Sequence, residues 1–215
     1  KIYCWLQLPR NKKINRQSNK SYPDINDVLD DMEVNAVIIC TPTKYHYSQV
    51  MSSLFSKKHV FCEKPLSNIE NEIKECYQLA KYNNLKLLCA LNMRFDPNIM
   101  GIKEKINKNE VGKIHNIMTI SRDFPYPTLE YLKISSGIFH DCAVHDIDFV
   151  NWLLDDKPMS VYVTGNIVKP ENVGANELDN ANIIMEYSGG IIATLNLSRI
   201  SKNYDQRIEV YGEKV

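Results

Sequence analysis

The stretch VNAVIIC, residues Val34–Cys40, decides the fold that this sequence predicts. It is a continuous apolar run rich in β-branched residues, as expected of a strand that is buried on both faces of a parallel sheet. Further strands are expected at Ile2–Leu8, His59–Cys62 and Leu85–Leu91, and helix signals cover Tyr45–Ser56. Strands that alternate with helices at this spacing predict an α/β fold built on a doubly wound parallel sheet.

Two other helices in this half are marked by their first residues. Asp24–Asp31 follows a proline and carries acidic side chains in its first turn, where they stabilise a helix. Ser67 and Glu70 have the spacing of a capping box. We therefore expect a helix to begin at Ser67 and to run to about Tyr82.

Beyond Arg94–Pro97 the sequence changes from alternation to a run of strands. Helices are expected near Pro97–Asn107 and over Gly137–Leu154, with a long strand at Lys113–Phe124 between them. More strands are expected at Ser160–Val168, Asn180–Tyr187, Gly190–Ser198 and Arg207–Tyr211. Ser188-Gly189-Gly190 predicts a hairpin turn between the second and third of these. This order indicates an α+β unit with an open mixed or antiparallel sheet.

One usual feature of a nucleotide-binding sheet is absent from the sequence. Such a fold opens with a strand, a glycine-rich turn and a helix whose N-terminus holds a pyrophosphate, yet no G-x-G-x-x-G occurs. The simplest interpretation is a chain truncated at both ends, with the first strand and glycine loop missing. We therefore expect a partial doubly wound domain over residues 1–94 and a C-terminally incomplete α+β domain over residues 95–215.

Composition excludes several classes of function. Lysine plus arginine number 26 and aspartate plus glutamate number 26, so the formal net charge is zero. This balance gives no long-range field for nucleic acid. No apolar run approaches the roughly 20 residues needed to span a bilayer, and no signal-peptide pattern opens the chain. The six cysteines include no C-x-x-C pair, which favours reduced thiols in a cytoplasmic protein.

Two turns lie where a parallel α/β sheet binds ligands, at the carboxyl ends of its strands. Thr41–Pro42 directly follows Val34–Cys40, and Glu63-Lys64-Pro65 follows the next expected strand. A lysine there can donate to a substrate hydroxyl, and its charge lowers the cost of forming an alkoxide as hydride leaves. The alternatives are a proline turn leading into a helix and an exposed charged turn. His46 can be interpreted as a surface histidine with no role.

The third candidate lies within Gly137–Leu154. In a helix, Asp141 and His145 share a face because they are four residues apart. Histidine is the natural base for a hydroxyl proton near neutral pH, and a carboxylate one turn away can orient it or bind substrate. The alternative is a simple helix ion pair. A metal site would also need His140, which a helix turns away from His145, so we expect no metal.

In this order and at this spacing, the motifs resemble the glucose–fructose oxidoreductase / inositol dehydrogenase / rhizopine-catabolism (Gfo/Idh/MocA) family of NAD(P)-dependent oxidoreductases. The resemblance covers essentially the whole chain. It is carried by VNAVIICTPTKYH (Val34–His46), HVFCEKPLS (His59–Ser67), LNMRFDP (Leu91–Pro97), GIFHDCAVHDIDFVNWLL (Gly137–Leu154) and RISKNYDQRIEVYGEKV (Arg199–Val215).

The resemblance implies roles for the candidate residues. Lys64 would contact both the substrate and the nicotinamide, with Glu63 near the nicotinamide ribose and Thr41–Pro42 lining the cofactor. Asp141 and His145 would lie beside the reacting hydroxyl. His145 would act as the general base, and Asp141 would bind a hydroxyl and hold the imidazole. The expected reaction is hydride transfer from a secondary hydroxyl of a cyclitol or sugar to the nicotinamide.

The same resemblance bears on substrate and partners. Arg94 and Tyr204 match positions that reach the substrate pocket in inositol dehydrogenase-like members. Other branches of the family carry tyrosine at the position of His145, so this histidine favours an inositol 2-dehydrogenase-like enzyme. The second domain would pair subunits through its open sheet, giving a homo-oligomer, and neither nucleic acid nor a membrane is expected as a partner.

Two questions stay open at this point. The run Leu6–Lys13 contains basic residues where the family often has an acidic one, which suits NADP. A solvated face is the default interpretation of this run, so the choice between NAD and NADP stays open. The missing glycine loop also allows a catalytically inactive relative that binds metabolites.

Overall fold

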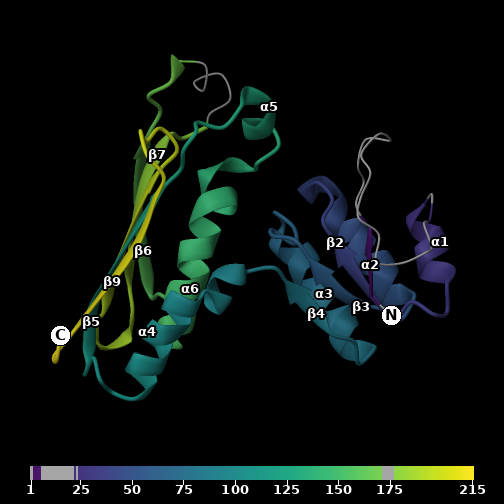
Figure 1. The fold of residues 1–215 in the computed structure, drawn as a ribbon, viewed down its shortest axis with the longest axis horizontal. Coiled ribbons are helices and arrows are strands. Elements are labelled where there is room, and N and C mark those ends of the chain that lie inside the picture. The colour runs from purple at the N-terminus through teal and green to yellow at the C-terminus, as the bar shows by residue number, and fades with distance from the viewer. Residues whose placement is uncertain (1, 6–21, 23, 171–176) are drawn as a thin grey trace. The chain divides into compact units, whose positions relative to one another are not determined.

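The computed structural model describes residues 2–5, 22, 24–170 and 177–215 (Figure 1). The chain folds into two compact units, Lys1–Ala90 and Leu91–Val215. No helix in the described residues is long and apolar enough to cross a membrane.

The first unit is a parallel sheet with helices in its connections, as the sequence predicts. Its strands lie in the order β1 (Ile2–Trp5), β2 (Ala36–Ile39), β3 (His59–Cys62) and β4 (Leu87–Cys89), and neighbouring strands are parallel. The connections contain α1 (Ile25–Asp30), η1 (Thr43–Tyr45), α2 (His46–Phe55) and α3 (Glu70–Tyr82).

One face of this sheet carries the core of the unit. Val37 and Ile39 of β2 and Cys62 of β3 are buried in one cluster with residues from α1, α2 and α3, among them Leu54. Successive strand side chains point to opposite faces. The other face carries Phe61 of β3 and Leu88 of β4, whose side chains are exposed. Of the burial expected on both faces of Val34–Cys40, the described residues show full burial on the helix-covered face and half-burial of Ile38 on the other.

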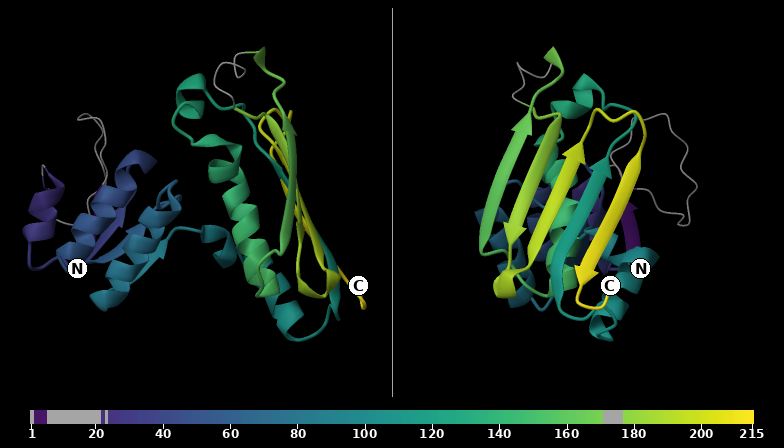
Figure 2. Two further views of the ribbon diagram at one scale, coloured as in Figure 1. Left: turned by 180° about the vertical axis from the view of Figure 1, so that it is seen from behind. Right: turned by 90° about the vertical axis from the view of Figure 1, so that its left-hand side faces the viewer.

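The second unit is the mixed sheet that the run of strands indicates. Its order is β6 (Ser160–Asn166), β7 (Asn180–Glu186), β8 (Ile192–Ser198), β5 (Ile114–Arg122) and β9 (Asp205–Gly212), and Figure 2 shows these strands side by side. Only the β5–β8 pair is parallel among the pairs described. The turn at Ser188–Gly190 joins β7 to β8 as an antiparallel hairpin, as expected.

Helices α4 (Pro97–Asn107) and α6 (Val144–Leu154) pack on one face of this sheet, and α6 runs along it in Figure 1. Phe149 and Leu153 of α6 are buried in the same cluster as Ile117 and Leu195 of the sheet. The apolar spacing of α6 thus fixes which of its faces points away from the sheet, and with it the direction of its polar residues.

The helix expected over Gly137–Leu154 is divided in two. A π-helical segment, η3 (Phe139–Ala143), precedes α6. Gly137 has φ +86°, a left-handed conformation that side chains disfavour, and it sets the chain direction into this segment. A short helix that the sequence did not predict, α5 (Leu129–Leu132), lies in the loop after β5 that contains Pro125 and Pro127.

The capping box predicted at Ser67 is wrong. Helix α3 begins at Glu70 after Ile69, and no side chain caps it. The Ser67 hydroxyl instead accepts from the Ile69 backbone N–H at 3.0 Å and donates to the Glu72 carboxylate. The serine therefore shapes the turn before the helix.

Candidate active site

Two strand-end turns of the first unit are joined by one buried histidine. His46 is 1% exposed, so its interpretation as a surface residue is wrong. Its Nδ1 lies 2.7 Å from the Pro65 carbonyl oxygen and its Nε2 lies 2.7 Å from the Thr41 carbonyl oxygen. Because β2 and β3 are parallel neighbours, their carboxyl ends meet at one edge, and His46 fixes the spacing of the two turns there.

Both ring nitrogens of His46 face hydrogen-bond acceptors. Both neighbours are carbonyl oxygens, which only accept hydrogen bonds. A neutral imidazole has one N–H and can donate to one of them, whereas the imidazolium donates to both. In either form, His46 links the turn after β2 to the turn after β3 that contains Lys64.

The backbone of this edge is held by further hydrogen bonds. The Thr41 hydroxyl donates to Gln49 Oε1 on α2 at 2.6 Å. The Glu63 N–H donates to the Ile39 carbonyl at 2.9 Å, which continues the β2–β3 pairing by one residue. The Lys64 N–H lies 3.1 Å from the Glu63 carboxylate. Glu63 and Lys64 therefore follow directly on an ordered strand.

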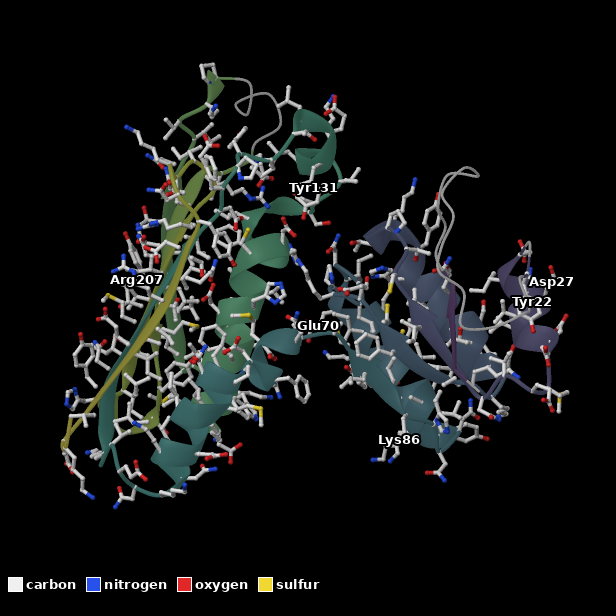
Figure 3. All side chains as sticks on the ribbon, in the orientation of Figure 1. Tyr22, Asp27, Glu70, Lys86, Tyr131 and Arg207 are labelled. Carbon is white, nitrogen blue, oxygen red and sulfur yellow. The ribbon has the colours of Figure 1, made fainter. Side chains whose placement is uncertain are left out.

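In the second unit, Asp141 lies in the π-helical segment η3 and is held by two donors. The Tyr131 hydroxyl, on α5 (Figure 3), donates to its carboxylate at 2.8 and 2.9 Å from the two oxygens. Arg199 Nη2 lies 3.0 Å from Asp141 Oδ2. Burial, followed by the hydrogen bond to Asp141, raises the pKa of Tyr131, so the phenol remains a donor.

His145 is the second residue of α6, one turn beyond Asp141. It is half-buried, and its Nδ1 is fully buried. Asp141 and His145, which the four-residue spacing is expected to place on one face, lie on either side of the junction between the π-helical segment and α6. Single π-turns inside helices occur frequently at functional sites.

Arg94 belongs to the same unit, in the short helix η2 (Asn92–Phe95). Its Nε donates to Asp148 Oδ2 at 2.6 Å and its Nη2 pairs with the other oxygen of that carboxylate. Asp148 follows His145 by three residues on α6. This bidentate ion pair therefore holds η2 against the turn of α6 that contains His145. Tyr204 lies in the loop between β8 and β9, with its side chain exposed.

A buried carboxyl follows His145 directly. Asp146 lies against β5, where the Ser121 hydroxyl is 2.8 and 3.0 Å from its two oxygens. Ser121 also lies 3.0 Å from Gln206 Oε1 on β9. Burial raises the pKa of Asp146 to about 6, and hydrogen bonds to Ser121 and Thr119 oppose the shift.

The raised pKa of Asp146 predicts a pH-dependent stability. A carboxyl whose folded pKa lies above its value of 3.8 contributes stability that is present below that value and is lost as pH rises through about 6. At about 1.4 kcal/mol for each unit of pKa, the full loss is on the order of 3 kcal/mol, of which about 2 kcal/mol falls between pH 4.5 and 7.5. Asp146→Asn should remove this component, as urea unfolding at pH 4.5 and 7.5 would measure. The exposed Asp27→Asn controls for the lost charge, and equal pH slopes for wild type and Asp146→Asn would contradict the prediction.

Two expectations concern ligands other than the substrate. In the described residues, no group of three or more histidine, cysteine, aspartate or glutamate side chains could hold a metal ion. His140 Nδ1 instead contacts the Ser136 carbonyl oxygen at 3.1 Å. The basic run Leu6–Lys13 lies outside the described residues.

Sequence reasoning missed three residues that hold the candidate groups: His46, Tyr131 and Arg199. His46 is the first residue of α2, which directs it toward the sheet edge. Arg199 follows a strand whose inward residues are apolar, and an arginine at the end of such a strand signals a buried ion pair. Tyr131 belongs to α5, for which the sequence carries no periodic signal.

Comparisons with known proteins follow the same division of the chain. Residues 7–91 match a family model described as an oxidoreductase family with an NAD-binding Rossmann fold. Residues 99–215 match the model of the GFO/IDH/MocA C-terminal domain.

Several individual relatives are named as inositol dehydrogenases. A myo-inositol 2-dehydrogenase of Thermotoga maritima is 34% identical over 197 residues, which are 91% of this chain and 59% of the relative. An inositol 2-dehydrogenase of Rhizobium meliloti is 34% identical over 184 residues, covering 85% of this chain and 56% of the relative. The crystal structure of a scyllo-inositol dehydrogenase from Lactobacillus casei, with NAD(H) and scyllo-inositol bound, superposes with a TM-score of 0.81 at 28% identity, covering 89% of this chain and 59% of that one. The chain thus spans less than two thirds of the length of these relatives.

Proposed function

This chain belongs to the GFO/IDH/MocA family of oxidoreductases, and on that premise we propose that the whole protein is an NAD(P)-dependent dehydrogenase. Its substrate is a cyclitol or sugar, of which it oxidises a secondary hydroxyl. The relatives named as inositol dehydrogenases support an inositol as the first candidate. The observation that carries the proposal is Asp141, fixed by two donors one helical turn before His145.

The proposed chemistry separates a proton from a hydride. His145 accepts the proton of the substrate hydroxyl, because imidazole is the side chain suited to that transfer near neutral pH. Asp141 accepts a hydrogen bond from the substrate. Lys64 donates to the reacting oxygen and stabilises the charge that grows on it. A nicotinamide held beside Glu63 and Lys64 would supply the acceptor for the hydride that leaves the substrate carbon.

The residues of the first unit fit a nicotinamide cofactor. Thr41, Pro42, Glu63 and Lys64 lie at the carboxyl edge of a parallel sheet, where such folds bind their ligands. The bridge of His46 between Thr41 and Pro65 supports this fit, because it fixes the two turns relative to each other. We propose that the first unit, Lys1–Ala90, is the cofactor domain and that the second unit, Leu91–Val215, is the substrate domain, in which Arg94 and Tyr204 reach the substrate.

An assay of the whole protein tests the proposal. NAD or NADP is supplied separately with myo-inositol, scyllo-inositol and common sugars, and reduced cofactor is measured. We expect turnover with at least one cyclitol and a preference for one cofactor. Cofactor binding without turnover of any polyol would overturn the dehydrogenase and favour a metabolite-binding relative. Loss of activity in chelator would instead favour a metal-dependent enzyme.

We further propose that the outer face of the second sheet pairs two copies of this chain. Ile184 and Ile192 on β7 and β8, with Tyr162 and Tyr211 on the flanking strands, are exposed apolar side chains of the open sheet. Light scattering of wild type and Ile184→Glu would test the pairing, which a monomeric wild type would contradict.

We also propose a cytoplasmic location for the protein. The free thiols at Cys40, Cys62, Cys76, Cys89 and Cys142 support it.

A further inference from the structure

Arg199 is a fully buried cation at the end of β8. Its side chain is 1% exposed, and its backbone N–H donates to the Asp179 carbonyl at 2.8 Å. An arginine keeps its charge in proteins, so a buried one must be paired. Because Arg199 directly follows the core strand β8, its backbone is held in place by the second sheet.

The guanidinium pairs with two carboxylates from separate segments. Nη1 lies 2.5 Å from Glu177 Oε1, and Nη2 lies 3.0 Å from Asp141 Oδ2. The Glu177 and Asp141 side chains are 10% and 14% exposed. Burial raises the pKa of Glu177, and the charge of Arg199 opposes that shift. Glu177 alone would neutralise Arg199, so the contact with Asp141 goes beyond charge balance.

Asp141 is the residue whose orientation this contact determines. Tyr131 reaches both of its oxygens from the short helix α5, whereas Arg199 reaches one of them from the sheet. A carboxylate held from two directions has one orientation available. The planar fork of arginine can hold Glu177 and Asp141 together, which the single ammonium of lysine cannot do in the same geometry.

We propose that Arg199 is the positioning residue for Asp141, fixing the carboxylate in the direction in which it receives the substrate hydroxyl. The proposal rests on the proposed function, because it is Asp141's role in binding substrate that makes its direction matter. Glu177 is the second partner, which keeps the guanidinium buried in one place. A displacement of about 1 Å at such a group can lower a rate by on the order of 100-fold.

The test must separate positioning from folding. Arg199→Met alone leaves two buried carboxylates without their cation and is expected to destabilise the unit. Arg199→Met combined with Glu177→Gln keeps the triad at the wild-type net charge, since one positive and one negative charge are both lost. Glu177→Gln alone is the reference for this double variant, and circular dichroism confirms that both fold.

The expected result is a loss of function in a folded protein. In the whole protein, kcat/KM for the cyclitol should be on the order of 10- to 100-fold lower in the double variant than in Glu177→Gln. The dissociation constant of the cofactor should be unchanged, because its proposed residues lie in the first unit. In the Glu177→Gln background, Arg199→Lys should lower kcat/KM less than Arg199→Met does. Equal kcat/KM in the double variant and its reference would overturn the proposal.

A third substitution shows whether Arg199 acts through Asp141. With Asp141→Asn already present, adding Arg199→Met to Glu177→Gln should lower kcat/KM no further, because the group to be positioned is gone. A fall of the same size in both backgrounds would mean a general structural role and would overturn the inference.

The same variants answer the question if the proposed function fails. Should the wild type oxidise no polyol, the thermal unfolding midpoints still report the Arg199–Asp141 contact. The midpoint change caused by Arg199→Met in the Glu177→Gln background should then depend on whether residue 141 is aspartate or asparagine. Strict additivity would overturn the inference, whereas absent turnover with clear coupling would refute the proposed function alone.

Discussion

Replacement of Lys64 by alanine should remove nearly all turnover, with kcat lower by on the order of 100- to 1000-fold. The ammonium group is proposed to donate to the oxygen that becomes charged as hydride leaves. That interaction is stronger in the transition state than in the bound substrate, so its loss lowers kcat. Steady-state rates with the best cyclitol and saturating cofactor would measure the effect.

Two controls make the Lys64 prediction specific. Lys86 is exposed (Figure 3) and directly precedes β4. Because β3 and β4 are parallel, Lys86 lies at the opposite end of these strands from Lys64. Lys86→Ala removes the same charge and should leave kcat near the wild-type value. Lys64→Met keeps most of the side-chain length without the charge and should lose as much activity as Lys64→Ala. A Lys64→Met enzyme that retains wild-type kcat would rule out the proposed role.

The elements of both units could be predicted from the sequence because their signals are local. The strand His59–Cys62 and the helix Pro97–Asn107 have the predicted bounds, since a short, largely apolar run and an Asp-Pro N-terminus each act within a few residues. Asp96 caps that helix by accepting from the Asn98 N–H at 2.8 Å. The mixed sheet could be predicted from the change to a run of strands beyond Arg94–Pro97 and from the glycine hairpin at Ser188–Gly190.

Features that depend on distant partners could not be predicted. Ser67 has the spacing of a capping box, yet its hydroxyl pairs with Glu72 because the chain bends before α3 begins. The π-turn at Phe139–Ala143 changes a hydrogen-bond pattern that single-sequence periodicity does not register.

The candidate site shows the same limit. Lys64, Asp141 and His145 stand out by residue type and spacing. The residues that hold them do not, because their roles come from chain segments far away in sequence. His46 bridges to Pro65, and Arg199 joins Glu177 to Asp141. Chemistry-bearing residues were thus visible in the sequence, while the contacts that orient them required the structure.

His145→Ala should lower kcat by on the order of 100- to 10,000-fold, which is the range for loss of a general base. The imidazole is proposed to take the hydroxyl proton, and alanine leaves no group on that turn of α6 to do so. Cofactor affinity should not change, because the substitution lies in the second unit. Rates and cofactor titrations on the same preparation would measure the two quantities separately.

Chemical rescue distinguishes proton transfer by His145 from support of the fold. Free imidazole added to His145→Ala should restore part of the rate in proportion to its concentration, because a small base can occupy the space of the lost ring. His140→Ala is the matched control, since it removes an exposed imidazole from the neighbouring π-turn; its rate should stay near wild type and should not respond to imidazole. If His145→Ala is folded, slow and indifferent to imidazole at every pH tested, the histidine supports the site without accepting the proton, and the general base must be sought elsewhere in the second unit.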